Sequence, residues 1–419
     1  MFESKNGVLH VEEVDFREIV RITGTPVYVT SRRLLEENIR AYRTHFGWAR
    51  MLYAVKANNN LALMRIFARS GFGADVFSAG ELYLALLAGF DRNYVLFNGN
   101  SKSDEEIEFG VRAGVKFSVD STDELYAISE IASNLGREVR IAFRVNPDIS
   151  PETHPKIATG LKTSKFGIPS AEILDAYRLA LELPSVEPAG IHCHIGSQIT
   201  DTSPFVEELE KMFEIARKLE EMGVRLDFLD MGGGFGIDYE GDGKADVGRF
   251  ASALRPVYER GVAELKSRPE LWIEPGRSLV ANTTVLITRV NSVKRAYRNF
   301  VAVDAGFNLL LRPAMYDAYH RVAVANKFGL EAEEVYTVVG PICESGDVLA
   351  RDRKLPRVEK GDYIVIFDAG AYGFAMSSQY NGRPRCAEVL VDGEQFHVIR
   401  ERESFGDLIS KQVIPEDLL

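Results

Sequence analysis

A lysine at the end of an apolar run is suited to covalent chemistry. Lys56 closes the stretch Met51-Leu-Tyr-Ala-Val-Lys56, and three asparagines, Asn58–Asn60, follow it. A continuous apolar run closed by turn-forming residues predicts a strand buried on both faces. Burial disfavours a charged amine, and a neutral amine can attack a carbonyl to form a Schiff base. A lysine that only extends its amine to solvent fits this stretch equally well.

A glycine cluster could hold a phosphate. Leu229-Asp-Met-Gly-Gly-Gly-Phe-Gly236 follows an expected strand, and adjacent glycines expose backbone N–H groups to an anion. The cluster does not fit G-x-G-x-x-G, because Ile237 and Tyr239 follow, and it lacks the lysine of a P-loop. A single phosphate is therefore favoured over a dinucleotide or triphosphate, and a plain tight turn is the alternative.

The segment His192-Cys193-His194 invites a zinc interpretation. Strand alternation would place both histidines on one face and the cysteine on the other, and no second cluster completes the ligand set. We expect no metal. One histidine pointing into the active-site mouth, with Ser197 in the following loop, could stack on a flat cofactor; a histidine of the core is the alternative.

Three further segments carry reactive side chains, but none of them indicates a catalytic or binding site by itself. Glu274-Pro-Gly-Arg277 joins an acid to a base, which also describes a common surface ion pair. Pro341–Asp347 places Cys343 beside Glu344, although a lone cysteine is usually a small apolar residue. Asp368–Gly373 holds a tyrosine between glycines.

The elements that must position these residues alternate regularly between about 32 and 275. Eight short apolar strands are expected near Met51, Gly73, Tyr94, Lys116, Val139, Gly190, Leu226 and Leu271, with helices between them. Alternation of this kind predicts parallel strands, and eight units in about 250 residues predict a TIM (β/α)8 barrel. An open doubly wound sheet is the alternative. Polar residues collect where the strands end: Lys56, Asp75, Asn98, Asp120, Arg144, His194, Gly232–Gly234 and Glu274.

After Glu274 the pattern changes to apolar runs separated by Gly, Pro and Asp, beginning with Val285–Val293 and ending with Glu388–Val391. These runs predict a mostly antiparallel β domain, which the strands expected over Val8–Val14 and Pro26–Thr30 would join. We therefore expect a barrel over 32–275, and a β domain over 1–31 and 276–419 that completes the active site and a dimer interface.

Composition favours a soluble cytoplasmic protein. The chain has 419 residues, a net charge of -11 and no apolar run long enough for a membrane span. The negative charge argues against nucleic-acid and anionic-membrane partners. Three cysteines make a disulfide framework improbable, and the N-terminus does not resemble a secretion signal.

In this order, the motifs resemble those of the fold type III pyridoxal-phosphate decarboxylases over nearly the whole chain. They are Y-A-V-K-A-N, H-C-H-I-G-S, G-G-G-F-G, E-P-G-R, C-E-S-G-D and A-G-A-Y-G. The stretch Thr153–Gly167 resembles the branch that acts on diaminopimelate. The resemblance implies decarboxylation of meso-2,6-diaminopimelate to L-lysine and CO2.

The resemblance also implies roles for the cofactor-binding residues. Lys56 would form the Schiff base with pyridoxal 5'-phosphate, His194 would stack on its ring, and Glu274 would face the ring nitrogen. Asp75 and Arg144 would lie nearby on the rim. The phosphate would be held by Ser197, Gly234 and the backbone of Gly276 and Arg277, and Tyr372 would complete that pocket.

Substrate binding and proton transfer follow from the same resemblance. Arg277, Arg312 and Tyr316 would bind the distal carboxylate, and Glu344 the distal ammonium, with Tyr372 adjacent. Cys343 would reprotonate the α-carbon as general acid. Because Cys343, Glu344 and Tyr372 serve the neighbouring subunit in this family, a homodimer with shared sites is implied.

Three alternatives stay open from the sequence. The first is a decarboxylase for another amino acid, namely carboxynorspermidine, ornithine or arginine. The second is an amino-acid racemase on a similar barrel, for which no two-base arrangement is evident. The third is an inactive binding protein, against which the presence of both Lys56 and Cys343 speaks.

Overall fold

The computed structural model describes residues 1–151, 153–154, 157, 159–160, 164–240 and 245–418. The chain divides into two compact units. The barrel unit comprises Asn38–Asp238 and Asp242–Leu279, and the β unit comprises Met1–Glu37, Tyr239–Gly241 and Val280–Leu419.

The barrel unit is a closed parallel barrel, as predicted from the alternation of strands and helices. Its strands among the described residues are β5 (Arg50–Ala54), β6 (Gly73–Val76), β7 (Val95–Phe97), β8 (Lys116–Val119), β9 (Val139–Asn146), β11 (Val186–Cys193), β12 (Phe228–Asp230) and β13 (Glu270–Ile273). Each pairs in parallel with its neighbours, and the pairings of β13 with β5 and of β8 with β9 close the ring. The open-sheet alternative is therefore wrong. The short β10 (Ile168–Pro169) adds to β9.

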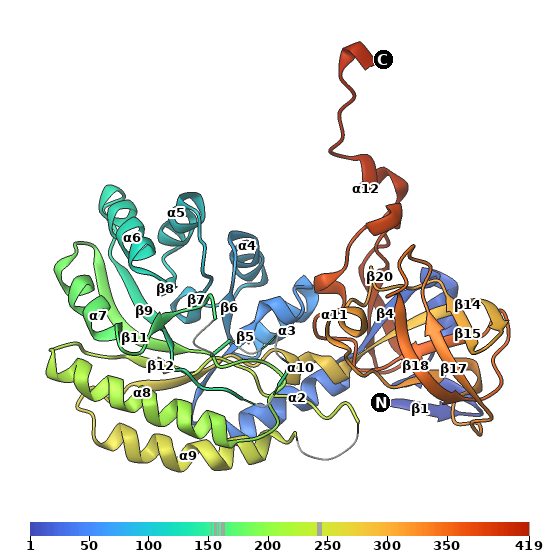
Figure 1. Cartoon of the computed structure of the whole chain (residues 1–419), viewed down its shortest axis with the longest axis horizontal. Coiled ribbons are helices and arrows are strands. Elements are labelled where there is room, and N and C mark those ends of the chain that lie inside the picture. The colour runs from blue at the N-terminus through green and yellow to red at the C-terminus, as the bar shows by residue number, and fades with distance from the viewer. Residues whose placement is uncertain (152, 155–156, 158, 161–163, 241–244, 419) are drawn as a thin grey trace. The chain divides into compact units, whose positions relative to one another are not determined.

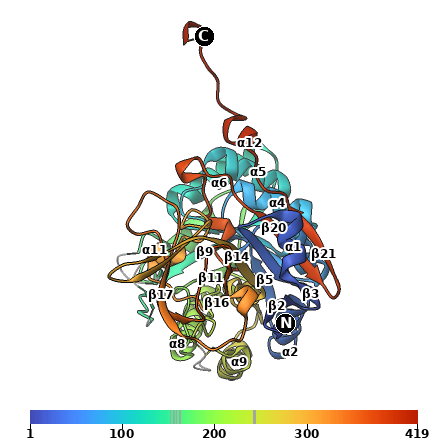
Figure 2. The ribbon, with the colours of Figure 1, turned by 90° about the vertical axis from the view of Figure 1, so that its right-hand side faces the viewer.

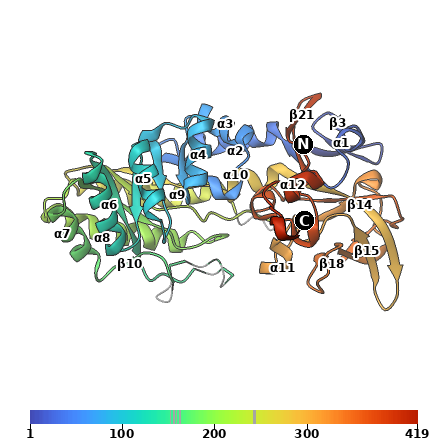
Figure 3. The ribbon, with the colours of Figure 1, turned by 90° about the horizontal axis from the view of Figure 1, so that it is seen from above.

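Helices surround these strands (Figures 1 and 3). They are α2 (Arg32–His45), α3 (Leu61–Arg69), α4 (Ala79–Ala88), α5 (Asp104–Ala113), α6 (Thr122–Asn134), α7 (Ile173–Glu182), α8 (Ser203–Glu221), α9 (Val247–Ala263) and the short α10 (Arg277–Val280). Sequence features fix several boundaries: Ser103 and Glu106 form a capping box at the start of α5, and Gly114 ends it in a left-handed conformation. These caps fix where α5 begins and ends.

The β unit is mostly antiparallel, as predicted. Its main sheet has the order β18-β17-β15-β14-β4-β20-β21, and β19 pairs with β14 and β16. The strands are β4 (Val27–Ser31), β14 (Thr284–Arg295), β15 (Asn299–Val303), β16 (Val322–Val324), β17 (Glu334–Val339), β18 (Val348–Leu355), β19 (Tyr363–Ile366), β20 (Ala387–Asp392) and β21 (Gln395–Arg400). The N-terminal strand β4 lies between β14 and β20, so residues from both ends of the sequence build one sheet (Figure 2).

A separate three-stranded sheet precedes β4, formed by β1 (Phe2–Lys5), β2 (Val8–Val11) and β3 (Val14–Asp15). The single strand expected over Val8–Val14 is wrong, because Glu12 takes a left-handed backbone conformation (φ 53°) and turns the chain between β2 and β3. The buried Glu12 carboxylate accepts hydrogen bonds from the Ser31 hydroxyl and the Arg33 amide. These hydrogen bonds stabilise the turn and explain why β2 and β3 are two strands rather than one.

Short helices of the β unit were not anticipated. They are α1 (Phe16–Thr23), α11 (Arg312–Tyr316) and α12 (Phe405–Ile409). The segment beyond β21, which includes α12, extends away from the sheet (Figures 1 and 2). None of the described helices has the length and apolar character needed to cross a membrane.

Candidate active site

A cavity of about 380 Å³ opens at the carboxyl ends of the barrel strands, where barrel enzymes bind their ligands. Strand-end and loop side chains line it: Lys56, Phe77, Ser78, Glu81, Asn98, Arg144, Thr159, Phe166, His192, His194 and Glu274. Four of the predicted cofactor-binding residues, Lys56, Arg144, His194 and Glu274, therefore share one cavity.

Lys56 lies in a single 3-10 turn, Val55–Ala57, directly after β5, rather than in the strand itself. Its Nζ atom donates a hydrogen bond to Oδ2 of Asp75, which is fully buried at the end of β6. Burial and the neighbouring Glu274 raise the pKa of Asp75, whereas the ion pair with Lys56 opposes this shift. The amine of Lys56 therefore lines the cavity, and the buried Asp75 carboxylate accepts its hydrogen bond.

Asn98 connects this pair to Glu274. Its Nδ2 atom donates to Oδ1 of Asp75 and, at 2.8 Å, to Oε1 of Glu274. Asn98 directly follows β7 and Glu274 directly follows β13, so residues distant in the sequence contribute to one hydrogen-bonded group.

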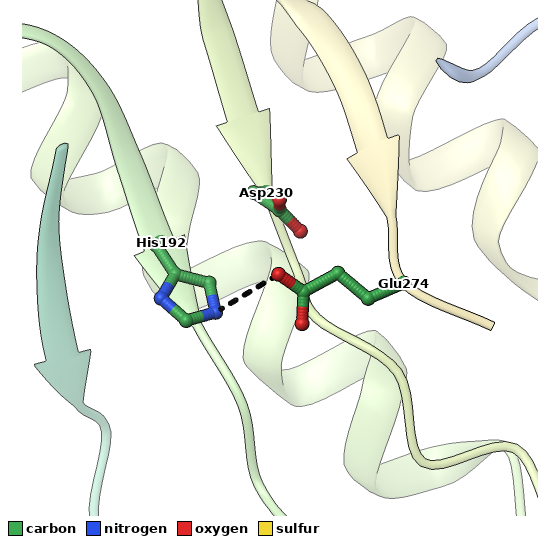
Figure 4. Close-up of side chains that lie close together, drawn as sticks. All are labelled: His192, Asp230 and Glu274. Carbon is green, nitrogen blue, oxygen red and sulfur yellow. Dashed lines mark ion pairs between the residues drawn. The ribbon is translucent and has the colours of Figure 1, made fainter. Parts of the chain in front are cut away.

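Glu274 also faces His192 and Asp230 (Figure 4). His192 Nε2 lies 3.7 Å from Glu274 Oε1, and all three side chains are buried. Burial would raise the pKa of Glu274, but the adjacent His192 and Lys56 lower it to about 2. Burial and the charge of Glu274 hold the pKa of Asp230 well above its usual range. Glu274 is thus the ionised carboxylate of the pair, and Asp230 is neutral.

His192, Asp230 and Glu274 also offer ligand atoms within 4.8 Å of one another, an arrangement that could hold a metal ion. No local sequence pattern links His192 to these carboxyl groups, because Asp230 and Glu274 come from other strand ends. Both His192 and His194 line the cavity, whereas only one histidine was expected to face it.

His194 is held in a neutral state. Burial, with the nearby Arg144 and Lys56 charges, places its pKa well below the usual range. Its Nδ1 atom accepts a hydrogen bond from the Gly233 amide at 3.2 Å, which fixes the ring in the loop after β11. The guanidinium of Arg144 lies 4.4 Å from the centre of the Phe166 ring.

The predicted phosphate residues of the barrel unit lie together. Arg277 donates to the Ser197 hydroxyl from Nη2 at 3.0 Å and from Nε at 3.3 Å. Gly234 has φ 108°, and a Cβ atom there would lie 2.3 Å from the Gly196 carbonyl oxygen. At Gly276 an added Cβ would lie 3.0 Å from the Cβ atoms of Ala54 and Ala57. Only glycine allows the backbone to approach this closely at these positions.

The predicted substrate residues outside the barrel unit belong to the β unit. Arg312 starts α11 and is buried; its Nη1 atom lies 2.8 Å from His320 Nε2, and its guanidinium lies 4.7 Å from the centre of the Tyr239 ring. Tyr316 ends the same helix. Tyr372 takes a left-handed conformation with φ 57° in the loop after β19.

Cys343 and Glu344 form a small polar cluster with two residues that the sequence analysis did not single out. Asn381 accepts from the Cys343 amide at 2.9 Å and donates to its sulfur at 3.1 Å. The Tyr380 hydroxyl donates to Glu344 at 2.8 Å, and this bond leads the causes that raise the pKa of Tyr380 to about 12. Cys343 is exposed, unlike Cys193 and Cys386.

The stretch Thr153–Gly167 is only partly described, since residues 155–156, 158 and 161–163 lie outside the described residues. Within it, Thr153 donates to the Ser197 carbonyl oxygen at 2.6 Å, and Thr159 to the His194 carbonyl oxygen at 2.9 Å. These bonds connect the stretch to the loop that carries the predicted ring and phosphate contacts.

Comparisons with known proteins agree with this geometry. The family described as "Pyridoxal-dependent decarboxylase, pyridoxal binding domain" matches residues 32–281. Diaminopimelate decarboxylase of Archaeoglobus fulgidus is 69% identical over 419 residues, which is 100% of both chains. The enzyme of that name from Methanothermobacter thermautotrophicus is 44% identical, with 99% of this chain and 97% of that one covered.

Solved structures show the same likeness. The crystal structure of diaminopimelate decarboxylase from M. jannaschii superposes with a TM-score of 0.94 and 41% identity, covering 100% of this chain and 99% of that one. A structure of the same enzyme with L-lysine gives the same TM-score and identity.

Proposed function

The chain belongs to the diaminopimelate decarboxylase family of pyridoxal-dependent decarboxylases, and from this membership we propose which of its residues carry out the reaction. It is a carboxy-lyase that uses pyridoxal 5'-phosphate to convert meso-2,6-diaminopimelate to L-lysine and CO2. The observation that carries this function is the 69% identity, over the whole chain, to a curated enzyme of that name.

The barrel residues fit the cofactor. The cavity offers an amine at Lys56 and an ionised carboxylate at Glu274, and the same unit offers the Ser197 hydroxyl with the closely packed glycines Gly234 and Gly276. These groups match an aldehyde, a pyridine nitrogen and a phosphate. When bound, the cofactor supplies an electron-withdrawing ring that stabilises negative charge on the carbon that loses CO2.

Lys56 would bind the aldehyde of the cofactor through Nζ. Asp75 holds this amine by an ion pair within a buried network, so the side chain is oriented before the cofactor arrives. Asn98 links Asp75 to Glu274 and keeps both acceptors in fixed positions. Such preorganisation lowers the entropy lost when reactive groups meet.

Glu274 and His194 would hold the ring. An ionised carboxylate stabilises a proton on the ring nitrogen, which makes the ring a stronger electron acceptor. A neutral His194 suits stacking, because it adds no positive charge next to a protonated ring. Arg144 would lie at the rim of the same cavity.

The phosphate would be bound by Ser197, Gly234, Gly276, Arg277 and Tyr372. Gly276 and Arg277 would contribute through their backbone, which leaves the Arg277 guanidinium for the substrate. The Gly233 amide already donates to His194, so we do not assign it to the phosphate.

Substrate selection would rest on charge at the far end of the amino acid. We assign the distal carboxylate to Arg277, Arg312 and Tyr316, and the distal ammonium to Glu344, with Tyr372 adjacent. Guanidinium groups bind carboxylates in a bidentate manner, and substrates without this carboxylate would leave buried donors unpaired.

Cys343 would return a proton to the α-carbon after CO2 leaves. Its thiol is exposed and hydrogen-bonded through Asn381, so the sulfur is fixed and still accessible to a ligand. Positioned general acids of this kind contribute about 10²–10⁴-fold to rate.

We propose that two copies of the chain share their active sites. A barrel over 32–275 would bind the cofactor, and the β domain of 1–31 and 276–419 would complete the site and form the dimer interface, with Cys343, Glu344 and Tyr372 serving the other subunit. We also place the enzyme in the cytoplasm, since its three free cysteines suit a reducing compartment.

The test of the proposed substrate is a comparison of CO2 release from meso-diaminopimelate, ornithine, arginine and carboxynorspermidine by the purified enzyme with pyridoxal phosphate. We expect release from diaminopimelate alone at a substantial rate. A preference for another amino acid would overturn the assignment of the distal carboxylate site.

A further inference from the structure

A buried serine–histidine pair lies behind the carboxylate assigned to the ring nitrogen. Ser118 on β8 and His192 on β11 are each only 1% exposed, and Ser118 Oγ lies 2.6 Å from His192 Nδ1. The opposite ring atom, Nε2, has no direct hydrogen-bond partner in the part of the chain that the structure describes, and lies 3.7 Å from Oε1 of Glu274.

This geometry fixes which histidine nitrogen carries the proton. If Nδ1 alone were protonated, the lone pair of Nε2 would face the Glu274 carboxylate and repel it. If the Ser118 hydroxyl donates to Nδ1, the proton of a neutral imidazole lies on Nε2 and points at that carboxylate, and a doubly protonated ring also carries a proton there. Only these arrangements avoid the repulsion, so the contact with Ser118 favours a proton on Nε2.

The serine is itself firmly held. Its backbone oxygen accepts a hydrogen bond from Lys102 Nζ at 3.0 Å, and the same amine pairs with Glu124 at 2.6 Å. Lys102 and Glu124 side chains are 2% and 7% exposed. A serine on a central strand, anchored in this way, has little freedom to turn from His192.

We propose that Ser118 and His192 are positioning residues that orient the Glu274 carboxylate toward the ring nitrogen of the cofactor. At 3.7 Å the contact with Glu274 is longer than a direct hydrogen bond, so His192 acts by the electrostatic attraction of its N–H. This inference rests on the proposed role of Glu274.

The other groups around Glu274 indicate that one of its carboxylate oxygens contacts the protein and the other is left for the cofactor. Asn98 donates to Oε1, the same atom that His192 faces, and the other oxygen points away from Asp230 (Figure 4). Of the other charged and titratable neighbours, Lys56 lowers the pKa of Glu274, the lowered pKa of His194 keeps that ring neutral, and the raised pKa of Asp230 keeps it uncharged. One oxygen is therefore engaged by the protein, which leaves the other for the ligand.

The consequence concerns the position of one proton. A carboxylate and a pyridine nitrogen that face each other compete for one proton, and the more basic of the two groups holds it. Removing the N–H of His192 would make Glu274 more basic and shift the proton from the ring nitrogen to the carboxyl. The ring would then withdraw electrons less strongly.

The test uses holoenzyme loaded with pyridoxal phosphate labelled with ¹⁵N in the ring, and reads the ¹⁵N chemical shift. Ser118→Ala removes the hydroxyl with little change in volume, and His192→Leu removes the N–H. His192→Gln restores a donor near the position of Nε2. Ser129→Ala is the matched control, since the buried Ser129 hydroxyl donates to the Pro184 carbonyl oxygen outside this network.

We expect a protonated ring nitrogen in the wild type, in Ser129→Ala and in His192→Gln. In Ser118→Ala and His192→Leu the shift should move toward that of unprotonated pyridine, with about a tenfold loss of kcat and little change in KM. If the wild type shows no protonated nitrogen, the proposed role of Glu274 is wrong. If the wild type shows a protonated ring nitrogen and Ser118→Ala gives the same ¹⁵N shift, the inference about Ser118 and His192 is overturned. This outcome can be read even if His192→Leu fails to fold.

Discussion

The Nη1 atom of Arg312 lies 2.8 Å from Nε2 of His320, and this contact fixes the guanidinium inside the β unit. His320 Nδ1 lies 2.8 Å from the Phe367 carbonyl oxygen, which can only accept, so Nδ1 carries the proton and Nε2 accepts from Arg312. The family resemblance pointed to Arg312, but no motif marked His320, eight residues further on, or Tyr239 as its contacts.

Replacing Arg312 tests the distal carboxylate site. Arg312→Ala should lower kcat/KM for meso-diaminopimelate about 100-fold, mainly through KM, because a charge-assisted contact with substrate is lost. CO2 release at varied substrate measures this. Arg351→Ala, which removes an exposed arginine of the same unit, should change kcat/KM less than about twofold. Nearly intact turnover in Arg312→Ala would disprove the assignment.

Mixing two inactive variants tests the shared sites. Lys56→Ala and Cys343→Ala should each lose nearly all activity as homodimers. If Cys343 serves the partner's site, a heterodimer of the two contains one intact site, and random mixing should restore about a quarter of the wild-type activity. The subunits are unfolded together and refolded before CO2 release is measured.

The control for this experiment mixes each variant with itself under the same conditions, which should restore nothing. If mass spectrometry shows heterodimers in the mixed sample but no activity is recovered, the sharing of sites between subunits is contradicted.

The two neighbouring carboxyl groups Glu274 and Asp230 should respond differently to isosteric replacement. Glu274→Gln removes a charge that the site uses, and kcat should fall by about 10² or more. Asp230→Asn should keep activity within about threefold, because burial already holds Asp230 protonated and an amide oxygen can accept from the Gly232 N–H as the carboxyl does. Equal losses in both variants would show that Asp230 is ionised.

Glu81 should make stability depend on pH. Burial raises its pKa to about 7 from the model-peptide value of 4.5, so the folded protein holds the proton more tightly than the unfolded chain. Its contribution to stability is therefore fully present below pH 4.5 and is lost as the pH rises through about 7. Urea unfolding across this interval should show a flatter pH profile in Glu81→Gln.

The Gln variant retains an acceptor for the Phe77 amide, which now donates to Glu81 Oε2 at 2.7 Å, so its fold should be kept. The exposed Glu130→Gln serves as the control and should leave the profile unchanged. An unchanged profile in Glu81→Gln would contradict the raised pKa.

The barrel was predictable because each of its strands is a short apolar run that ends in a polar residue. Parallel strands gather such ends at one edge, so Lys56, Asp75, Arg144 and Glu274 were expected near one another, and the structure brings them to one buried network and cavity. The antiparallel β unit followed from its Gly- and Pro-separated runs, and β4 was expected to join it.

Other features depend on partners that only the fold brings together. Ser118 and His192 are 74 residues apart, and Asn98 and Glu274 are 176 apart, so no local pattern reveals their contacts. The strand expected over Val8–Val14 failed for a similar reason: the turn at Glu12 is held by Ser31 and Arg33, which lie about twenty residues further on. Sequence periodicity predicts helices and strands, but it does not predict polar contacts between residues that are far apart in the chain.

The most direct test of the whole account is an absorbance spectrum of the purified enzyme with pyridoxal phosphate, with CO2 recorded after meso-diaminopimelate is added. We predict a visible band in the wild type, its loss in Lys56→Ala, and CO2 release only where the band is present. A wild-type enzyme that shows no band after incubation with pyridoxal phosphate, or that releases CO2 equally well without Lys56, would contradict it.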